Sequence, residues 1–70
     1  MPRLRISSSV MAAVEYDEEH ETLDVEFRNG RRYVYRRVPR QVYDELLAAP
    51  SKGRFFNDRI RGLYPFGRVV

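Results

Sequence analysis

The sequence predicts one small α+β domain: a three-stranded antiparallel meander followed by two helices packed on one face, in the order β-β-β-α-α. Three observations lead to this prediction. Apolar and polar residues alternate along residues 22–27, Asn29-Gly30 marks a tight hairpin, and apolar residues recur at helical spacing after Pro39. A sheet with one apolar face needs a covering layer, and two amphipathic helices would supply it.

Length and composition limit the chain to one domain, residues 1–70. A chain of 70 residues buries only about 60% of its unfolded surface, and without cysteine it has no disulfide to stabilise it. Nearly every strand and helix must therefore contribute to one core. No apolar run approaches the roughly 20 residues that cross a bilayer, and none follows the basic start as in a secretory signal. We expect a cytoplasmic protein without membrane contact.

The first strand is predicted at residues 10–16, after a polar and frayed start at residues 1–9. Its apolar residues recur at a period of two, although the alanines would also suit a helix: Val10, Ala12, Val14 and Tyr16. A polar turn follows. In the second strand three apolar residues alternate with polar ones: Leu23, Val25 and Phe27.

The hairpin at Asn29-Gly30 admits two registers, which differ by one residue. A two-residue loop would turn Tyr33 and Tyr35 onto the polar face of the sheet. A three-residue loop, with Gly30 as a left-handed bulge, would turn both rings onto the apolar face and set Glu26 beside Arg32. A slip of one residue moves every side chain to the opposite face, so the hydrophobic pattern decides the register. We predict the bulged turn.

The third strand, residues 31–37, ends at Val38-Pro39, where proline favours the start of a helix. The first helix is predicted over residues 40–49, with Pro50 as its stop. Its apolar residues fall at helical spacing: Val42, Tyr43, Leu46 and Leu47. The second helix begins after the N-cap Ser51, ends near Gly62, and buries a stripe of three residues: Phe55, Phe56 and Ile60. The apolar tail, residues 63–70, should pack back on the core.

The residue inventory argues against an enzyme. The only histidine, His20, lies in an acidic turn, and neither the serines at 7–9 nor Ser51 has an evident base to activate it. Residues 17–21 could offer oxygen ligands to a cation, but they match no loop of defined ligand spacing. We therefore predict no catalytic residue, no metal site and no cofactor.

Charge is distributed unevenly along the chain. Residues 1–27 contain two arginines and seven acidic residues, whereas residues 28–70 contain eleven basic and three acidic ones. Arginine presents planar donors suited to phosphate, so we predict a nucleic-acid-binding surface. Its candidate residues are Arg28, Arg32, Arg36, Arg40, Lys52 and Arg54. The alternative is that Asp24 and Glu26 neutralise these arginines on the sheet.

Two further segments carry a functional and a structural interpretation each. At the start of the second helix, Ser51, Lys52, Gly53 and Arg54 could bind an anion, or Ser51 could simply cap the helix while Gly53 allows close packing. Tyr33-Val34-Tyr35 could be a stacking platform for unpaired bases. In the bulged register, however, both rings belong to the helix-covered side, and we interpret them as core.

Several of these residues recur in one ordered pattern. Its parts are Tyr16-Asp17, Leu23-x-Val25-x-Phe27-x-Asn29-Gly30, Tyr33-x-Tyr35, Val38-Pro39, Ser51-x-Gly53-x-Phe55-Phe56-Asn57 and Ile60-Arg61. The pattern, over residues 7–69, resembles the KTSC domain. That family is named for a C-terminal domain of some lysyl-tRNA synthetases and also occurs as free-standing short bacterial proteins. The resemblance implies a small accessory domain that could bind RNA.

Three functions therefore remain open. The first is an RNA-binding accessory module that contacts phosphates. The second is a protein-interaction or homodimerisation module that uses the uncovered sheet face or an edge strand. The third is a site for a phosphorylated small ligand at the second helix.

Overall fold

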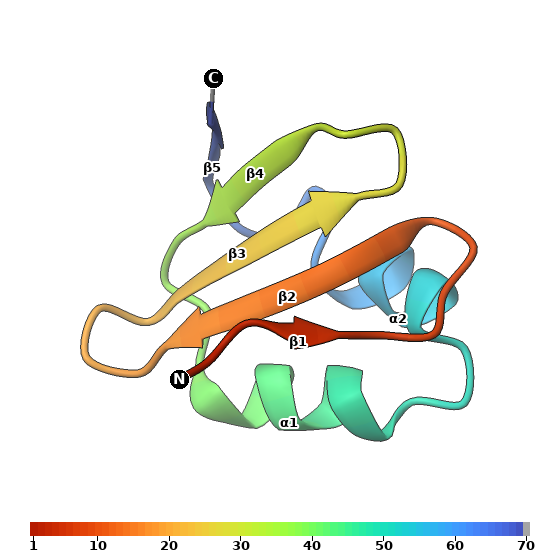
Figure 1. Ribbon diagram of the computed structural model, residues 1–70. Coiled ribbons are helices and arrows are strands. Elements are labelled where there is room, and N and C mark those ends of the chain that lie inside the picture. The colour runs from red at the N-terminus through yellow and green to blue at the C-terminus, as the bar shows by residue number, and fades with distance from the viewer. Residues whose placement is uncertain (70) are drawn as a thin grey trace.

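The computed structural model describes residues 1–69, which form a five-stranded antiparallel sheet and two helices (Figure 1). The strands are β1 (Leu4–Arg5), β2 (Met11–Asp17), β3 (Thr22–Phe27), β4 (Arg32–Tyr35) and β5 (Phe66–Val69). The helices are α1 (Arg40–Ala48) and α2 (Lys52–Arg59). The α+β class is as predicted, but the predicted sheet lacked its two outer strands.

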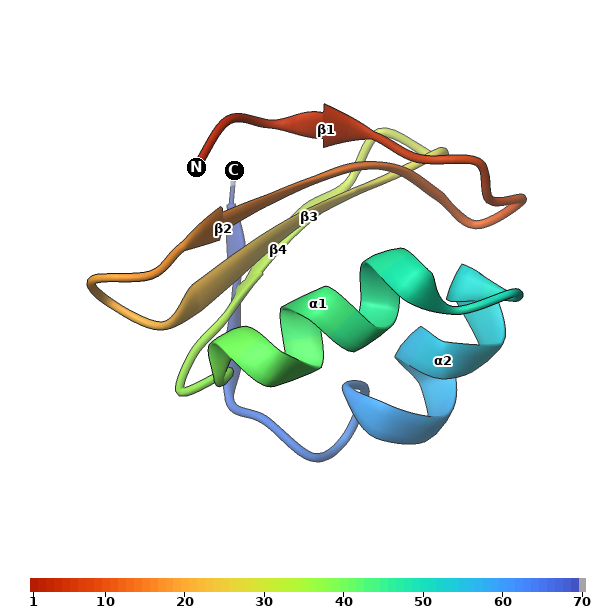
Figure 2. The ribbon, with the colours of Figure 1, turned by 90° about the horizontal axis from the view of Figure 1, so that it is seen from below.

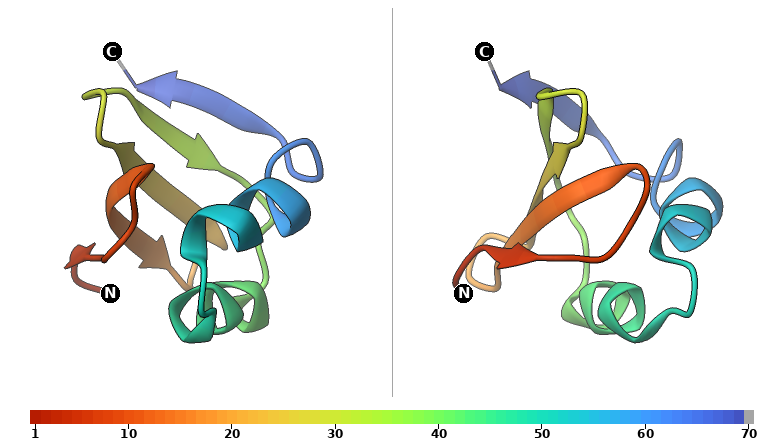
Figure 3. Two further views of the ribbon diagram at one scale, coloured as in Figure 1. Left: turned by 90° about the vertical axis from the view of Figure 1, so that its right-hand side faces the viewer. Right: turned by 45° about the vertical axis from the view of Figure 1, so that its right-hand side comes forward.

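Both helices lie on the same face of the sheet, which leaves the other face uncovered (Figure 2). The strands follow chain order across the sheet, and the two helices connect β4 to β5 at its edge (Figure 3). The core lies between the sheet and the helices. Its fully buried side chains are Met11, Val14, Tyr16, Leu23, Val25, Val38, Leu46 and Ile60.

The β3–β4 hairpin has the predicted bulged register. Gly30 has a φ of 89°, the left-handed value that glycine adopts without strain, and its N–H donates to the Phe27 carbonyl at 3.0 Å. Val25 therefore pairs with Tyr33, and Glu26 with Arg32. Both hairpin tyrosines consequently face the helices.

Two predictions for the N-terminal part were wrong. Residues 1–9 are not frayed: Leu4 and Arg5 pair with β2, and Ile6 is buried. The strict alternation predicted for residues 10–16 is broken by a β-bulge between Met11 and Ala13. One extra residue turns the side chain of every preceding residue in the strand to the opposite face of the sheet, so Met11 is buried and Val10 is exposed.

The helices and the tail follow the prediction with small changes. α1 ends one residue earlier than predicted, before Pro50, and α2 begins after the Ser51 cap. Tyr64 packs against the core, whereas the side chains of β5 are exposed and its backbone pairs with β4. Val70, the last residue of the predicted tail, lies outside the described residues.

Candidate nucleic-acid interface

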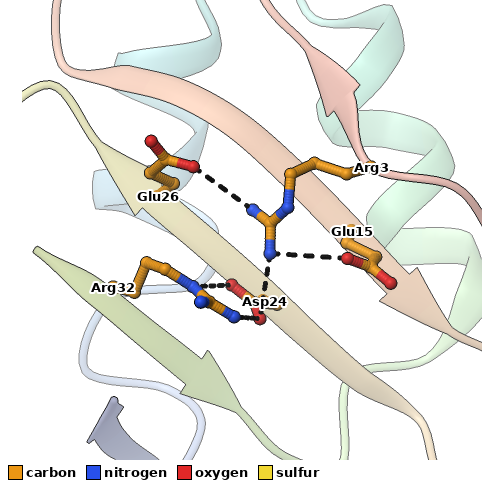
Figure 4. Close-up of polar contacts among 5 residues, drawn as sticks. All are labelled: Arg3, Glu15, Asp24, Glu26 and Arg32. Carbon is orange, nitrogen blue, oxygen red and sulfur yellow. Dashed lines mark hydrogen bonds and ion pairs between the residues drawn. The ribbon is translucent and has the colours of Figure 1, made fainter. Parts of the chain in front are cut away.

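The uncovered sheet face contains an ion-pair network of two arginines and three carboxylates (Figure 4). Asp24 of β3 lies between the two guanidinium groups, with its Oδ2 atom 2.6 Å from Arg32 Nη2 and 3.2 Å from Arg3 Nη2. Arg3 also lies 3.4 Å from Glu15 and 3.6 Å from Glu26. The alternative interpretation therefore holds for Arg32, which is paired within its own sheet face.

The central carboxylate of this network is held in its ionised form. Partial burial alone would raise the pKa of Asp24, but the hydrogen bonds and charges of Arg32 and Arg3 outweigh it and lower that pKa below its usual value. At neutral pH Asp24 is therefore fully charged, and it holds both guanidinium groups against the sheet.

The six predicted phosphate-binding residues do not form one surface. Arg40 is paired like Arg32, with its Nη1 atom 3.2 Å from Glu18 and its Nε atom 3.1 Å from Asp44. Arg36 is exposed beyond the end of β4 and lies apart from the remaining three residues. The structure brings the other three together: Arg28, Lys52 and Arg54.

These three cations line a surface hollow of about 770 Å³ between the loop before β2 and the N-terminus of α2. We call it the cationic hollow. It is lined by residues 7–10, Arg28, residues 50–54, Asn57 and Asp58. It thus unites Arg28 with the anion site predicted at Ser51, Lys52, Gly53 and Arg54.

Hydrogen bonds fix Arg28 against the serine loop that forms one wall. The Ser8 hydroxyl accepts from the Val10 N–H at 3.1 Å and from the Met11 N–H at 3.2 Å, which shapes the loop. The Arg28 N–H donates to the Val10 carbonyl at 2.9 Å, and its Nε donates to the Ser8 carbonyl. Within residues 1–69 the terminal guanidinium nitrogens of Arg28 have no hydrogen-bond or ion-pair partner, so they are available to a ligand.

The start of α2 forms the opposite wall. The Ser51 hydroxyl accepts from the Arg54 N–H at 3.3 Å, so the predicted cap is confirmed. The N–H groups of Lys52 and Gly53 have no acceptor among residues 1–69. A Cβ atom on Gly53 would lie 3.6 Å from Val10, an ordinary packing distance, so close packing does not require glycine. Anion binding at these amides stays a prediction.

The charge in the hollow is largely uncompensated within the described part of the chain. Lys52 Nζ donates to the Ala49 carbonyl at 3.1 Å, and neither Arg28 nor Arg54 forms an ion pair with a described residue. Asp58 is the one carboxylate that lines the hollow. Three cations and two open amides are the donors that proteins use to hold phosphate oxygens.

The acidic turn forms a local pair. His20 Nδ1 lies 2.8 Å from Asp17 Oδ2, and this contact raises the pKa of His20 and lowers that of Asp17. Across residues 1–69, no three potential ligand side chains gather closely enough to hold a metal ion. In the same range, no helix has both the length and the apolarity needed to cross a membrane.

The hairpin tyrosines lie on the helix-covered side, as the core interpretation requires. Tyr35 is only 4% exposed, whereas Tyr33 is half-buried at the margin. The sequence did not indicate that Ser8 and Val10 would approach α2, because no periodicity links a loop to a distant helix. Nor did it place Arg3 in an ion-pair network.

The chain is similar in sequence to a known domain family and to several bacterial proteins. Residues 7–64 match the sequence profile of the KTSC domain. A lysine–tRNA ligase from Nostoc punctiforme is 40% identical over 68 residues, and the match covers 97% of this chain. The chain spans only 12% of that ligase. An uncharacterized protein from Stutzerimonas stutzeri is 44% identical over 81% of this chain and 80% of its own length.

A solved structure has the same fold. It is the crystal structure of a KTSC domain protein from Yersinia pestis, with a TM-score of 0.95 and 32% sequence identity. The match covers 99% of this chain and 97% of that protein. The five strands and two helices are therefore shared with a protein of almost equal length.

Proposed function

The chain belongs to the KTSC domain family, and on that premise we propose that it is a small accessory module that binds RNA through phosphates in the cationic hollow. Lysine–tRNA ligases contain a segment similar to this chain, and such enzymes handle RNA, which favours RNA over other phosphate-bearing ligands. Most of the ligase lies outside the matched segment, so an auxiliary role suits the small size of the domain.

One observation carries this proposal: Arg28, which directly follows β3, meets Lys52 and Arg54 of the first turn of α2 in one hollow. The chain contains other arginines, but Arg32 and Arg40 already bind carboxylates of the protein itself. Cations without such partners are available to neutralise phosphates, and the counterions that they displace give binding its salt dependence.

Salt dependence of affinity provides the test. Titration of a short single-stranded RNA into the full chain at several salt concentrations should give a log–log slope of about −2, since three phosphate contacts contribute about −0.7 each. Replacing Arg28, Lys52 and Arg54 together with alanine should bring the slope close to zero. A flat wild-type plot, or no binding near 50 mM salt, would remove the proposal.

A second candidate, self-association, rests on the edge strand β5. Its four residues are exposed and its outer edge is open to another strand, and Phe66 and Val69 present apolar surface there. Sedimentation over a range of concentrations should then reveal a dimer, which Val69→Lys would weaken because lysine disfavours edge pairing. A monomer at every concentration would exclude this candidate.

A further inference from the structure

Five aromatic rings form a closed circle where β3, β4, β5 and α2 meet. Each ring contacts the next at a centroid distance between 5.4 and 5.7 Å. In order around the circle they are Phe27, Tyr33, Phe66, Tyr35 and Phe56. All five line one pocket of about 300 Å³, which we call the aromatic pocket. Its volume is at the small end of the range for ligand sites, about 300–1,000 Å³.

The pocket has a buried floor and an open lip. Tyr35 and Phe56 are almost fully buried, whereas Phe66 on β5 is 55% exposed. An aromatic ring exposed to this degree beside a preformed pocket offers a face on which a flat ligand can stack.

One polar group at the pocket, the Tyr35 hydroxyl, is open to a ligand. The hydroxyl of the core residue Tyr16 donates to the Val38 carbonyl at 2.6 Å. The Tyr35 hydroxyl has no such partner among residues 1–69, and it reaches solvent although its residue is only 4% exposed. A phenol is protonated at neutral pH, and burial raises the pKa of Tyr35 further, so this hydroxyl can donate or accept a hydrogen bond. Arg31 and Arg61 also line the pocket.

The aromatic pocket adjoins the cationic hollow. Val10 and Asn57 line both, so the two sites share part of their walls. Rings, an open hydroxyl and neighbouring cations together match a group that is flat, polar at its edge and attached to phosphate. An apolar peptide side chain would use the rings but leave the hydroxyl and the cations without partners.

We propose that the aromatic pocket takes one unpaired RNA base, stacked against Phe66, while the phosphate of the same or the adjacent nucleotide lies in the cationic hollow. This inference rests on the proposed function, because it adds a base site to the phosphate site. Every base has an aromatic face, so the pocket tolerates different bases and prefers single-stranded over paired RNA.

The test compares RNA with and without bases. Fluorescence anisotropy measures binding of a labelled oligouridine and of a backbone-matched abasic oligomer to the full chain. Phe66→Ala should weaken oligouridine binding about tenfold or more and leave abasic binding and the salt slope unchanged. Leu63→Ala is the matched control, since Leu63 is 63% exposed, precedes the same strand and does not line the pocket. If Phe66→Ala does not fold, Tyr35→Phe, which removes only the hydroxyl and changes no charge, should weaken oligouridine binding and leave abasic binding unchanged.

A second readout separates the base site from the RNA function. Uridine monophosphate should shift the amide resonances of Tyr35, Phe56 and Phe66 in NMR spectra of the wild-type chain. If uridine monophosphate shifts these resonances but neither oligomer binds, the pocket is upheld and the proposed function is rejected. Equal oligouridine binding by wild type, Phe66→Ala and Tyr35→Phe would overturn the pocket alone. No shift and no oligomer binding would overturn both.

Discussion

The uncovered sheet face and the cationic hollow both contain arginines, but they use them differently. On the sheet face Arg32 and Arg3 are bound by Asp24, which accepts from one and lies 3.2 Å from the other. In the hollow Arg28 and Arg54 have no carboxylate partner among the described residues. Arg28 and Arg32 are four residues apart in the sequence and flank the same turn.

The difference shows that register, and not the number of charges, decides what an arginine does. The bulged hairpin sets Arg32 on the face of Asp24 and Glu26, where it stabilises the sheet. Arg28 lies before the turn, where its backbone pairs with Val10 and its side chain reaches the serine loop. Charges already paired inside the protein contribute to folding, and those left open remain for a partner.

The largest expected effect is on RNA affinity, when arginines of the hollow and of the sheet face are replaced with glutamate. Arg28→Glu with Arg54→Glu should lower RNA affinity about 100-fold or more, because attraction to phosphate becomes repulsion. The matched pair, Arg32→Glu with Arg36→Glu, should change RNA affinity far less and lower stability instead. Anisotropy titration and urea unfolding measure the two effects. Equal affinity losses for both pairs would show that the protein binds RNA through its overall charge.

Asp24→Asn should lower the free energy of unfolding by about 2 kcal/mol, because two arginines lose their ionised acceptor in a partly buried site. Since the pKa of Asp24 is lowered in the folded state, its contribution is complete above its unfolded pKa and is lost as pH falls through the folded value. Urea unfolding measures the change. Glu15→Gln, at a more exposed position, should cost less than about 0.5 kcal/mol; an equal cost would contradict a central role for Asp24.

The buried residues Tyr16 and Tyr35 show the same difference in their hydroxyl groups, since only the Tyr16 hydroxyl is bonded to a described residue. Tyr16→Phe should cost about 1 kcal/mol of unfolding free energy, because the Val38 carbonyl loses its donor in the core. Tyr35→Phe should change stability by less than about 0.5 kcal/mol, because its hydroxyl has no partner to lose. Thermal unfolding of both variants measures the difference. A larger cost at Tyr35 would show that its hydroxyl contributes to folding.

The smallest expected effect is a pH dependence at the exposed pair of Asp17 and His20. Its stabilisation is present between the lowered pKa of Asp17 and the raised pKa of His20, and it fades as pH moves through either. Wild type and His20→Ala should therefore differ slightly in unfolding midpoint near pH 6 and converge at higher pH. A difference that grows with pH would contradict this assignment.

The sequence predicted the central elements of the fold because their patterns are local. The hairpin register followed from Gly30 and from the alternation of Leu23, Val25 and Phe27. The outer strands were missed because β1 has two residues and β5 exposes every side chain, so neither buries an alternating face. Pairing at the sheet edges, and not hydrophobic pattern, places them.

The candidate site was predicted only in part. Helix capping signals correctly located the start of α2, and Ser51 is its cap. The meeting of Arg28 with Lys52 depends on a serine loop folding over α2, a long-range contact without a sequence signal. The sequence predicts core positions for Tyr33 and Tyr35 but not the aromatic pocket that they line, because Phe66 and Phe56 reach them only through long-range contacts.

The β-bulge at the start of β2 orients Val10 so that it lines both the cationic hollow and the aromatic pocket. Without the extra residue Val10 would point inward, Met11 would turn to solvent, and the hollow and the pocket would lose one of their two shared lining residues. Insertion or deletion of a single residue at the bulge would therefore change which side chains line the two sites, while β2 keeps its pairing with β3 from Ala13 onward.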